Sequence, residues 1–446
     1  MTNVPSRPST DRSADRTDRY RTVLDDTLAY ARVRDYTGWD YCDGMSSRFR
    51  RLLPFDNKWV NLAFQEPIKR APVNLRPLFL VERRRNFKGA ALFAMANLQA
   101  HRLAEVSRSA EGATATATDR ATATATDRAA ATAVDHEAEA RRLLDWLVAN
   151  RCVGYHGFCV GHNHVIQQLD YQKRPGQPGI VATSFAVKAL LAGASLDPTY
   201  ADLAATSEDF VVHDLDYRPV DGGATIKYHQ QQSDDYYTVN AGALGARLFL
   251  DLYARDGGED RLDRATAILD FIADHQHAIG GWTYRLPPEA SHLSMDNHHN
   301  GFIAESLLRY RAVTGSARYD DTIDRALAFH RHVLFDDDGA PNWDETSTYP
   351  RDVHAAAQGV VVFTMAGNPE FARRIIDWTL GHLYAGDGRF YYRRERFYTN
   401  RTTLMRWCEA WMAYAISYYL VATTAPAAGV VERPFSQVVT EGSVDD

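Results

Sequence analysis

The chain has 446 residues and a formal net charge of −7, and 45% of its residues are hydrophobic. This length fits two or three average domains or one large toroid or barrel, and the apolar content is sufficient for a sizeable core. The mild charge, with arginines alternating with acids, argues against a nucleic-acid-binding surface, and no apolar run approaches the roughly 20 residues of a membrane span.

The cysteines and the N-terminus indicate the cellular setting. The four cysteines form no Cys-x-x-Cys pair, which suits a reducing interior. The first residues, MTNVPSRPSTDRSADRTDRY, lack the apolar stretch of a secretion signal. We therefore expect a soluble, cytoplasmic protein.

Three segments are predicted to lack regular structure. Residues 1–17 are polar and rich in Arg and Asp, which is typical of a disordered arm. Residues 107–135 contain a near-duplicate of TATATDRA and resemble a low-complexity insertion in a loop. Residues 422–446 are expected to form a flexible tail. The remainder, residues 18–421, is predicted to be a single domain, because a long surface insertion costs little closure entropy.

Between these segments, apolar residues recur at three and four positions, which is the pattern of helices. In chain order, helices are predicted over residues 18–36, 88–106, 137–150, 181–194, 240–257, 262–276, 301–315, 319–334, 352–367, 369–383 and 403–420. Convincing period-two runs, the pattern of strands, are nearly absent. The fold class is therefore all-α.

Glycine followed by aromatic residues recurs in the connections, as in GGWTY, GAPNW and GRFYY. Gly281, Gly339 and Gly388 are 58 and 49 residues apart, a period that fits a repeated helical hairpin. About five or six such hairpins can close into an (α/α)6-type toroid with short aromatic β-like loops. Alternate helices then line the centre, and the long loops gather at one mouth.

One loop-to-helix junction at this mouth is SMDNHHNGF, residues 294–302. It holds Asp296, Asn297, His298 and His299 directly before an apolar-periodic helix. An acid and a histidine at a helix N-terminus can transfer protons or hold sugar hydroxyls, and the helix dipole lowers the histidine pKa. Helix capping explains one of these residues but not four together, so we favour a functional interpretation.

A second junction contains Tyr349, Pro350, Asp352 and His354. Proline and an acid suit the first turn of a helix for structural reasons alone. His354, in contrast, is a cationisable group at the unfavourable end of the dipole. Both a ligand-facing and a structural His354 therefore stay open.

The last strong helix carries Arg406, Trp407, Glu409 and Trp411. Arg406 either clamps a carboxylate, as a uronic acid site would require, or forms a salt bridge with Glu409 on the same helix face. The two tryptophans are expected to pack in the core.

Aromatic and charged residues also meet in the loops, where a sugar ring needs flat apolar faces and planar polar groups. The predicted substrate-binding residues are Trp39, Asp40, Asp43, Tyr228, Trp282, Asn297, Tyr349, Tyr392, Arg406 and Glu409. The predicted catalytic residues are Asp296, His298, His299, Asp352 and His354. For Asp43, which precedes Gly44, a plain turn is the alternative.

No metal or cofactor is expected. His156, His162 and His164 match no zinc-binding spacing, so a polar loop is favoured over a metal site. Phosphate-binding loops, G-x-S-x-G elbows and dinucleotide fingerprints are absent from the sequence. Residues 276–282 fit a single copy of the Q-x₃-G-x-W repeat of squalene-type cyclases, in which the repeat ties helix ends to a stacked tryptophan. The D-x-D-D acid motif of those cyclases is absent from the sequence.

Five runs together resemble one protein family: RDYTGWDYCDGMSS, NFKGAALF, MDNHHNGFIAESL, TYPRDVHAAAQ and FYYRRERFYTNRTTLMRWCEAWMAYAISYY. The family comprises bacterial and archaeal proteins encoded with surface-polysaccharide and S-layer N-glycosylation genes. Its fold is similar to the six-hairpin glycosidases and to the α/α domain of glucuronate C5-epimerases. The sequence departs from the family at His299-Asn300, where His-Thr is usual, and at Cys408-Glu409, where Gly-Gln is usual.

The resemblance and the polar residues together predict an enzyme acting on a sugar of a surface glycan, with an oligosaccharide or lipid-linked sugar as its substrate. Hydrolysis would use two carboxylates among Asp43, Asp296 and Asp352. Epimerisation or elimination would use a His or Tyr base and an arginine clamp on a uronate. The alternatives are a non-catalytic glycan-binding or scaffold protein and an isoprenoid cyclase-like toroid.

Overall fold

The computed structural model describes residues 9–54, 56–114, 134–169 and 171–424. Helix α1 spans Ser9–Arg32 and α4 spans Phe87–Thr114, so residues 9–17 and 107–114 are helical, although the sequence pattern predicts no regular structure there. Helix α16 continues to Thr424. The predictions for residues 1–8, 115–133 and 425–446 lie outside the described residues.

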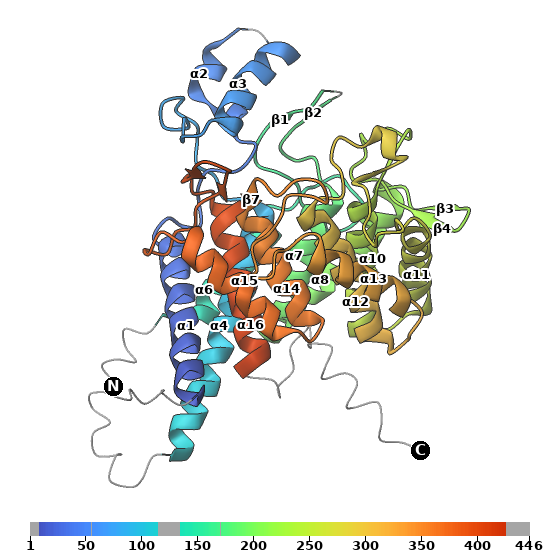
Figure 1. The fold of residues 1–446 in the computed structure, drawn as a ribbon. Helices are drawn as coiled ribbons and strands as arrows, with labels where there is room; N and C mark the ends of the chain where they lie inside the picture. The colour runs from blue at the N-terminus through green and yellow to red at the C-terminus, as the bar shows by residue number, and fades with distance from the viewer. Residues whose placement is uncertain (1–8, 55, 115–133, 170, 425–446) are drawn as a thin grey trace.

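Alternate helices form a closed inner ring (Figure 1). Its members are α4, α7 (Ile180–Ala192), α10 (Val239–Asp256), α12 (Asn297–Thr314), α14 (Val353–Met365) and α16 (Trp411–Thr424). Each helix packs against the next, and α16 packs against α4, which closes the ring.

A second layer of helices surrounds this ring. It consists of α1, α6 (His136–Ala149), α8 (Pro198–Ala205), α11 (Glu259–Asp274), α13 (Asp320–His332) and α15 (Pro369–His382). In chain order these helices pack against α16, α4, α7, α10, α12 and α14. The predicted all-α fold, an (α/α)6-type toroid, is confirmed.

The two layers differ in their burial, as their sequences require. Every residue of α14, VHAAAQGVVVFTM, is buried, because an inner helix contacts neighbours on all sides. Helix α11 buries only Ala265, Ile268, Leu269 and Ile272, which lie three and four residues apart on one face.

The recurring glycines have a packing role in the toroid. Gly280 has a φ of +101°, and an added Cβ would lie 2.3 Å from the carbonyl oxygen of Arg325 on α13. Gly339 has a φ of +92°, and an added Cβ would lie 2.5 Å from the carbonyl carbon of Arg374 on α15. Each loop therefore lies directly on the following outer helix, which accounts for the glycine repeat.

Short antiparallel strands join the loops. The pairs are β1 (Ile166–Gln167) with β2 (Gln172–Lys173), β3 (Arg218–Val220) with β4 (Gly223–Thr225), and β5 (Tyr237–Thr238) with β6 (Arg285–Leu286). A three-stranded sheet has the order β7 (Arg351–Asp352), β8 (Arg393–Arg394), β9 (Thr399–Asn400). In it Asp352 pairs with Arg393, so the loops before α14 and α16 are held together.

Short helical turns complete the described chain. They are η3 (Gly193–Ser195), α9 (Ser207–Asp209), the π-helix η4 (Phe210–Asp214), η5 (Pro288–Ala290) and the π-helix η6 (Met405–Ala410). No helix among the described residues combines the length and apolarity needed to cross a bilayer.

A small lobe stands above the toroid between α1 and α4 in the chain (Figure 1). It contains η1 (Gly44–Ser46), α2 (Arg48–Leu52) and α3 (Lys58–Arg70), none of which was predicted. Side chains of α3 contact the β1–β2 hairpin, where Asn61 donates to the Gln167 side chain at 2.9 Å. The lobe therefore belongs to the mouth of the toroid.

Candidate functional site

The N-terminal ends of α4, α12 and α14 and the π-helix η6 bring one group of polar and aromatic side chains together. His298 and His299 come from α12, His354 from α14 and Trp407 from η6. The His354 ring centroid lies 4.5 Å from those of both His298 and Trp407. π-Helical turns are frequent at functional sites, because they redirect a side chain within an otherwise regular helix.

Asp296 both caps α12 and holds two histidines. Its carboxylate accepts the backbone N–H of His299 and lies 2.8 Å from Nδ1 of His299 and 3.3 Å from Nδ1 of His298. Burial raises the pKa of Asp296, but the two histidines and the hydrogen bonds from His299 outweigh it, and the pKa is lower than usual. A carboxylate at Nδ1 favours the tautomer in which Nε2 is free to accept a proton.

His298 and His354 form a buried pair of imidazoles. Their rings are inclined by 30°, and burial holds the pKa of both well below the usual histidine value. Neither ring nitrogen of His354 has a hydrogen-bond partner within the described part of the chain. Buried polar atoms without partners are uncommon in folded proteins, and at a concave centre they indicate where a ligand or water would bind.

Asp352 caps α14 and carries a perturbed carboxyl group. Its Oδ1 accepts the backbone N–H of His354 and the indole N–H of Trp407, both at 2.8 Å. Its Oδ2 has no partner among the described residues. Burial raises the pKa of Asp352 to about 6, so this group can act as a general acid near neutral pH.

Lys88 lies at the base of the group, close to the N-terminus of α4. Its Nζ is 4.5 Å from the ring centroid of Phe185 and 4.7 Å from those of Phe302 and Trp411, and the described residues offer it neither a hydrogen bond nor an ion pair. Trp411 in turn lies 4.4 Å from His354, between ring centroids. Burial and the charge of Arg406 hold the pKa of Lys88 well below its usual value.

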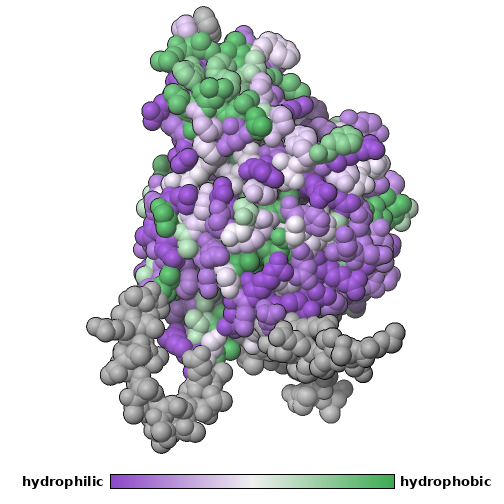
Figure 2. Space-filling model, turned by 60° about the vertical axis from the view of Figure 1, so that its left-hand side comes forward, coloured by the Kyte–Doolittle hydropathy of each residue, from purple (hydrophilic) through white to green (hydrophobic). Residues whose placement is uncertain are grey.

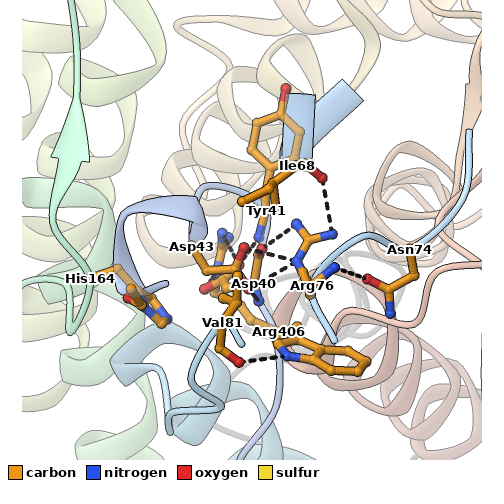
Figure 3. A network of polar contacts seen from close by, with 11 residues as sticks. Asp40, Tyr41, Asp43, Ile68, Asn74, Arg76, Val81, His164 and Arg406 are labelled. Atoms are coloured by element: carbon orange, nitrogen blue, oxygen red, sulfur yellow. Dashed lines mark hydrogen bonds and ion pairs between the residues drawn. The ribbon is translucent and has the colours of Figure 1, made fainter. Parts of the chain in front are cut away.

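A buried polar network joins the lobe to this site (Figure 3). Arg406 donates to both oxygens of Asp40, at 2.9 and 2.6 Å, and Asn86 donates to Asp40 at 2.8 Å. Arg76 binds Asp43 at 2.8 Å and also donates to the carbonyl of Asp40. The fork of Arg406 thus holds Asp40, a carboxylate of the protein itself, whereas the sequence suggested a uronate of the substrate or Glu409 as its partner.

Two loop histidines lie beside this network. Nδ1 of His164 is 2.8 Å from Oγ of Ser46 in the lobe, and its Nε2 has no partner within the described chain. Burial lowers the pKa of His164 to about 4. Burial, followed by the charges of Lys173 and Arg406, lowers the pKa of His162 well below its usual value.

Two predicted substrate-binding residues, Asn297 and Trp282, are engaged within the fold. Asn297 donates to the carbonyls of Leu334 and Asn342. Trp282 is buried and donates from its indole N–H to the carbonyl of Ile272 at 2.7 Å. These contacts tie helix ends together, so the hydrogen-bonding groups of Asn297 and Trp282 named here are used within the fold.

Glu409 is buried, and its Oε1 accepts the backbone N–H of Phe390 at 2.9 Å. Burial raises its pKa well above the usual value. Asp43 is equally enclosed, by Arg76, and burial raises its pKa to about 6. Both carboxyls are thus engaged away from the histidine pair, Asp43 with Arg76 and Glu409 with the backbone of Phe390.

The remaining predicted aromatic residues lie around the mouth. Tyr392 is buried, with its ring centroid 6.4 Å from that of Trp407, and the pKa of Tyr228 is raised to about 12 by burial. Trp39 donates to the carbonyl of Val81 at 3.2 Å, beside the lobe. Tyr349 contacts the guanidinium of Arg351.

The one group of potential metal ligands found among the described residues is Asp296, His298 and His299, whose ligand atoms lie within 4.8 Å of one another. The 2.8 Å contact of His299 with Asp296 has the length of a hydrogen bond between an imidazole and a carboxylate. This bond accounts for the approach of His299 to Asp296 without an ion.

Sequence reasoning missed Lys88 and Tyr284, and it assigned His162 and His164 to a polar loop and Trp407 to the core. Tyr284 lies 4.6 Å from His299 between ring centroids. The sequence contains one signal that could have identified Lys88. It is a charged residue in an apolar inner helix, in a chain with few lysines.

The comparisons with known proteins concern the fold. No protein-family model matches the chain. No curated protein sequence matches it. Solved structures do: a sugar epimerase from a ruminal bacterium has a TM-score of 0.53 at 14% identity, with 76% of this chain and 88% of that chain covered.

A D-mannose isomerase has a TM-score of 0.53 at 9% identity, with 76% of this chain and 88% of that chain covered. A GH76 α-mannanase from Bacteroides thetaiotaomicron has a TM-score of 0.51 at 13% identity, with 74% and 85% covered. At these identities the likeness shows a shared α/α-toroid fold, which is a fold of sugar epimerases, isomerases and glycoside hydrolases.

Proposed function

We propose that this protein is a carbohydrate-active enzyme that moves a proton at a sugar carbon beside a carbonyl group, as in epimerisation or isomerisation. The observation that carries the proposal is the buried pair His298 and His354, with His298 oriented by Asp296. Two neutral imidazoles side by side supply a base and, once one of them is protonated, an acid. The fold shared with a sugar epimerase and a D-mannose isomerase supports the same chemistry.

The reaction follows from the free ring nitrogens. Nε2 of His298 takes the proton from the carbon next to the carbonyl of the open-chain sugar, and the electron pair forms an enediolate. The imidazolium of His298 passes this proton to the neighbouring imidazole of His354. His354 then returns it to the same carbon on its opposite face, which inverts that carbon, or to the carbonyl carbon while the hydroxyl proton moves to the carbonyl oxygen, which isomerises the sugar. The composition of the sugar is unchanged, and no external oxidant or reductant is needed.

Lys88 contributes to this chemistry from its position near the N-terminus of α4. The amine of Lys88, among Phe185, Phe302 and Trp411, can donate a hydrogen bond to the carbonyl oxygen as negative charge develops there in the enediolate. The low-polarity surroundings strengthen that interaction, because they exclude water from the developing charge.

We infer further that the sugar belongs to a surface polysaccharide or protein N-glycan, or to its lipid-linked precursor, and that the enzyme works in the cytoplasm. The sequence resemblance to proteins encoded with such glycan genes supports this placement. A non-catalytic glycan-binding role would instead depend on Trp39 and Tyr392 and would tolerate loss of Asp296. An isoprenoid cyclase would need an apolar centre, which the buried Asp296, His298 and His354 disfavour.

Glycoside hydrolysis is the second candidate, favoured by Asp352. Its pKa of about 6 and its unpartnered Oδ2 suit a general acid that protonates a leaving oxygen. The shared fold with a GH76 α-mannanase supports it. Hydrolysis would leave two shorter glycans, whereas epimerisation would leave the mass unchanged.

The test is mass spectrometry, with separation of isomers, of glycans from a deletion strain complemented with wild-type, Asp296→Asn or His275→Ala protein. Asn retains the helix cap but removes the charge that orients His298, so we expect Asp296→Asn to reproduce the deletion. His275 is exposed and serves as the matched control. Unchanged glycans in the deletion strain would refute the pathway, and an altered isomer at constant mass would exclude hydrolysis.

A further inference from the structure

The lobe of residues 41–86 exposes an apolar surface. Among its large hydrophobic side chains Leu52 is 78% exposed, Leu78 70% and Trp59 66%, and Phe49, Val73 and Leu80 are also exposed. Figure 2 shows these apolar residues gathered at the top of the molecule, over α2 and α3. Contiguous exposed apolar surface of this kind marks an interaction site.

Helix α3 is oriented with its polar side inward. The residues it buries are Asn61, Gln65 and Ile68, and the two amides are hydrogen-bonded to Gln167 of β1. Trp59, on the same helix, faces solvent. Because the buried amides fix this orientation, the apolar exposure is built into the lobe.

The lobe is also basic in an acidic protein. Residues 41–86 contain ten Lys and Arg and four Asp and Glu, a net charge of +6, while the whole chain carries −7. Exposed cations flank the apolar side chains at Arg48, Arg51, Lys58, Arg70 and Arg83. The rest of the chain therefore carries a net charge of −13, because −7 is the sum of +6 and −13.

We propose that this lobe docks on an anionic lipid surface, with the toroid mouth facing the membrane. Apolar side chains, an interfacial tryptophan and flanking cations are the combination that binds the headgroup region without spanning the bilayer. A second copy of the chain is less suited to this surface, because two equivalent lobes, each with a net charge of +6, would repel each other. The acidic remainder is repelled by anionic lipids, which orients the molecule.

The contacts of the lobe connect this surface to the site. Asp40 and Asp43, which bind Arg406 and Arg76, stand at the base of the lobe, and Lys58 donates to the carbonyl of Leu169 in the β1–β2 turn at 3.1 Å. A glycan attached to a membrane lipid would reach the mouth of the toroid from this side.

The test is sedimentation of the full-length protein with vesicles of phosphatidylcholine, with and without phosphatidylglycerol. We expect binding that needs phosphatidylglycerol and weakens with salt. The double variants Leu52→Ser with Trp59→Ser, and Arg48→Glu with Arg70→Glu, should each lower the affinity at least about tenfold. The control Val153→Ser with Arg108→Glu removes an exposed apolar residue and an exposed cation elsewhere and should bind like wild type.

Circular dichroism and thermal melting must show that the lobe variants remain folded. Failure of the wild type to bind either vesicle, or equal binding by the lobe variants, would overturn the proposal. The proposal would also be overturned if the wild type were a dimer in light scattering, if Leu52→Ser with Trp59→Ser dissociated that dimer, and if no vesicles were bound. In that case a second copy of the chain would cover the apolar surface of the lobe. His298→Ala should bind vesicles normally, which separates this proposal from the catalytic one.

Discussion

At the scale of single residues, the two buried lysines of the inner helices, Lys88 and Lys188, differ in their partners. Lys188 lies 2.9 Å from Glu305, whose pKa is lowered to about 2 by Lys188 and Arg247 against the opposing effect of burial. Nζ of Lys88 instead contacts the rings of Phe185, Phe302 and Trp411, and the described residues give it no ion pair. A buried amine without a counter-ion costs stability, and such a cost is commonly retained where function requires it.

Replacing Lys88 is therefore expected to raise the stability of the protein and to lower its activity. Lys88→Met should raise the free energy of unfolding by roughly 1–3 kcal/mol, because it removes the desolvation cost, and should abolish turnover. Lys188→Met is the matched control, and it should lower stability by about 3–5 kcal/mol because Glu305 loses a partner. Denaturant unfolding measures both, and a destabilised Lys88→Met would contradict this assignment.

His354 should make stability depend on pH in the acid range. Its pKa is lowered in the folded protein, so the unfolded chain takes up a proton first as the pH falls below about 6.5. One such group lowers the free energy of unfolding by about 1.4 kcal/mol per pH unit in that range. His354→Phe should reduce this slope by about 1.4 kcal/mol per pH unit, the contribution of one proton, in urea titrations at several pH values. An unchanged slope would show that His354 does not stay neutral.

At the scale of elements, loop glycines position the hairpins. Gly339→Ala should destabilise the protein by roughly 2–4 kcal/mol, because its Cβ meets the backbone of α15 and its φ is positive. Gly386 has a similar φ of +88° with nothing within 4 Å of an added Cβ, so Gly386→Ala should cost only about 1 kcal/mol. Equal losses in thermal melting would contradict the packing argument.

The elements also show what the sequence could predict. Inner and outer helices of the toroid carry apolar residues at helical spacing, so most were predicted. Helix α3 was missed because its buried face contains Asn61 and Gln65, and α8 was missed because it is short. The π-helical turn at η6 leaves no pattern, since it differs from an α-helix only in its hydrogen bonds.

At the scale of the whole molecule, the site depends on contacts between distant parts of the chain. Asp40 and Arg406 are 366 residues apart, and Lys88 and His354 meet the same Trp411 only because α16 closes the ring against α4. Capping residues such as Asp296 and Asp352 could be identified locally from the sequence. The partner of Arg406 could not, because residue types and spacings do not specify which distant carboxylate fills its fork.

The central claim is proton transfer by the pair His298 and His354, and its most direct test is exchange with solvent. Reducing sugars, including mannose and the hexoses recovered from the glycans, would be incubated with the protein in D₂O and followed by NMR. We predict deuterium at the carbon next to the carbonyl with wild type and His275→Ala, and at least about a hundredfold slower incorporation with His298→Ala. Epimer formation without deuterium uptake, or equal uptake with His298→Ala, would contradict the account.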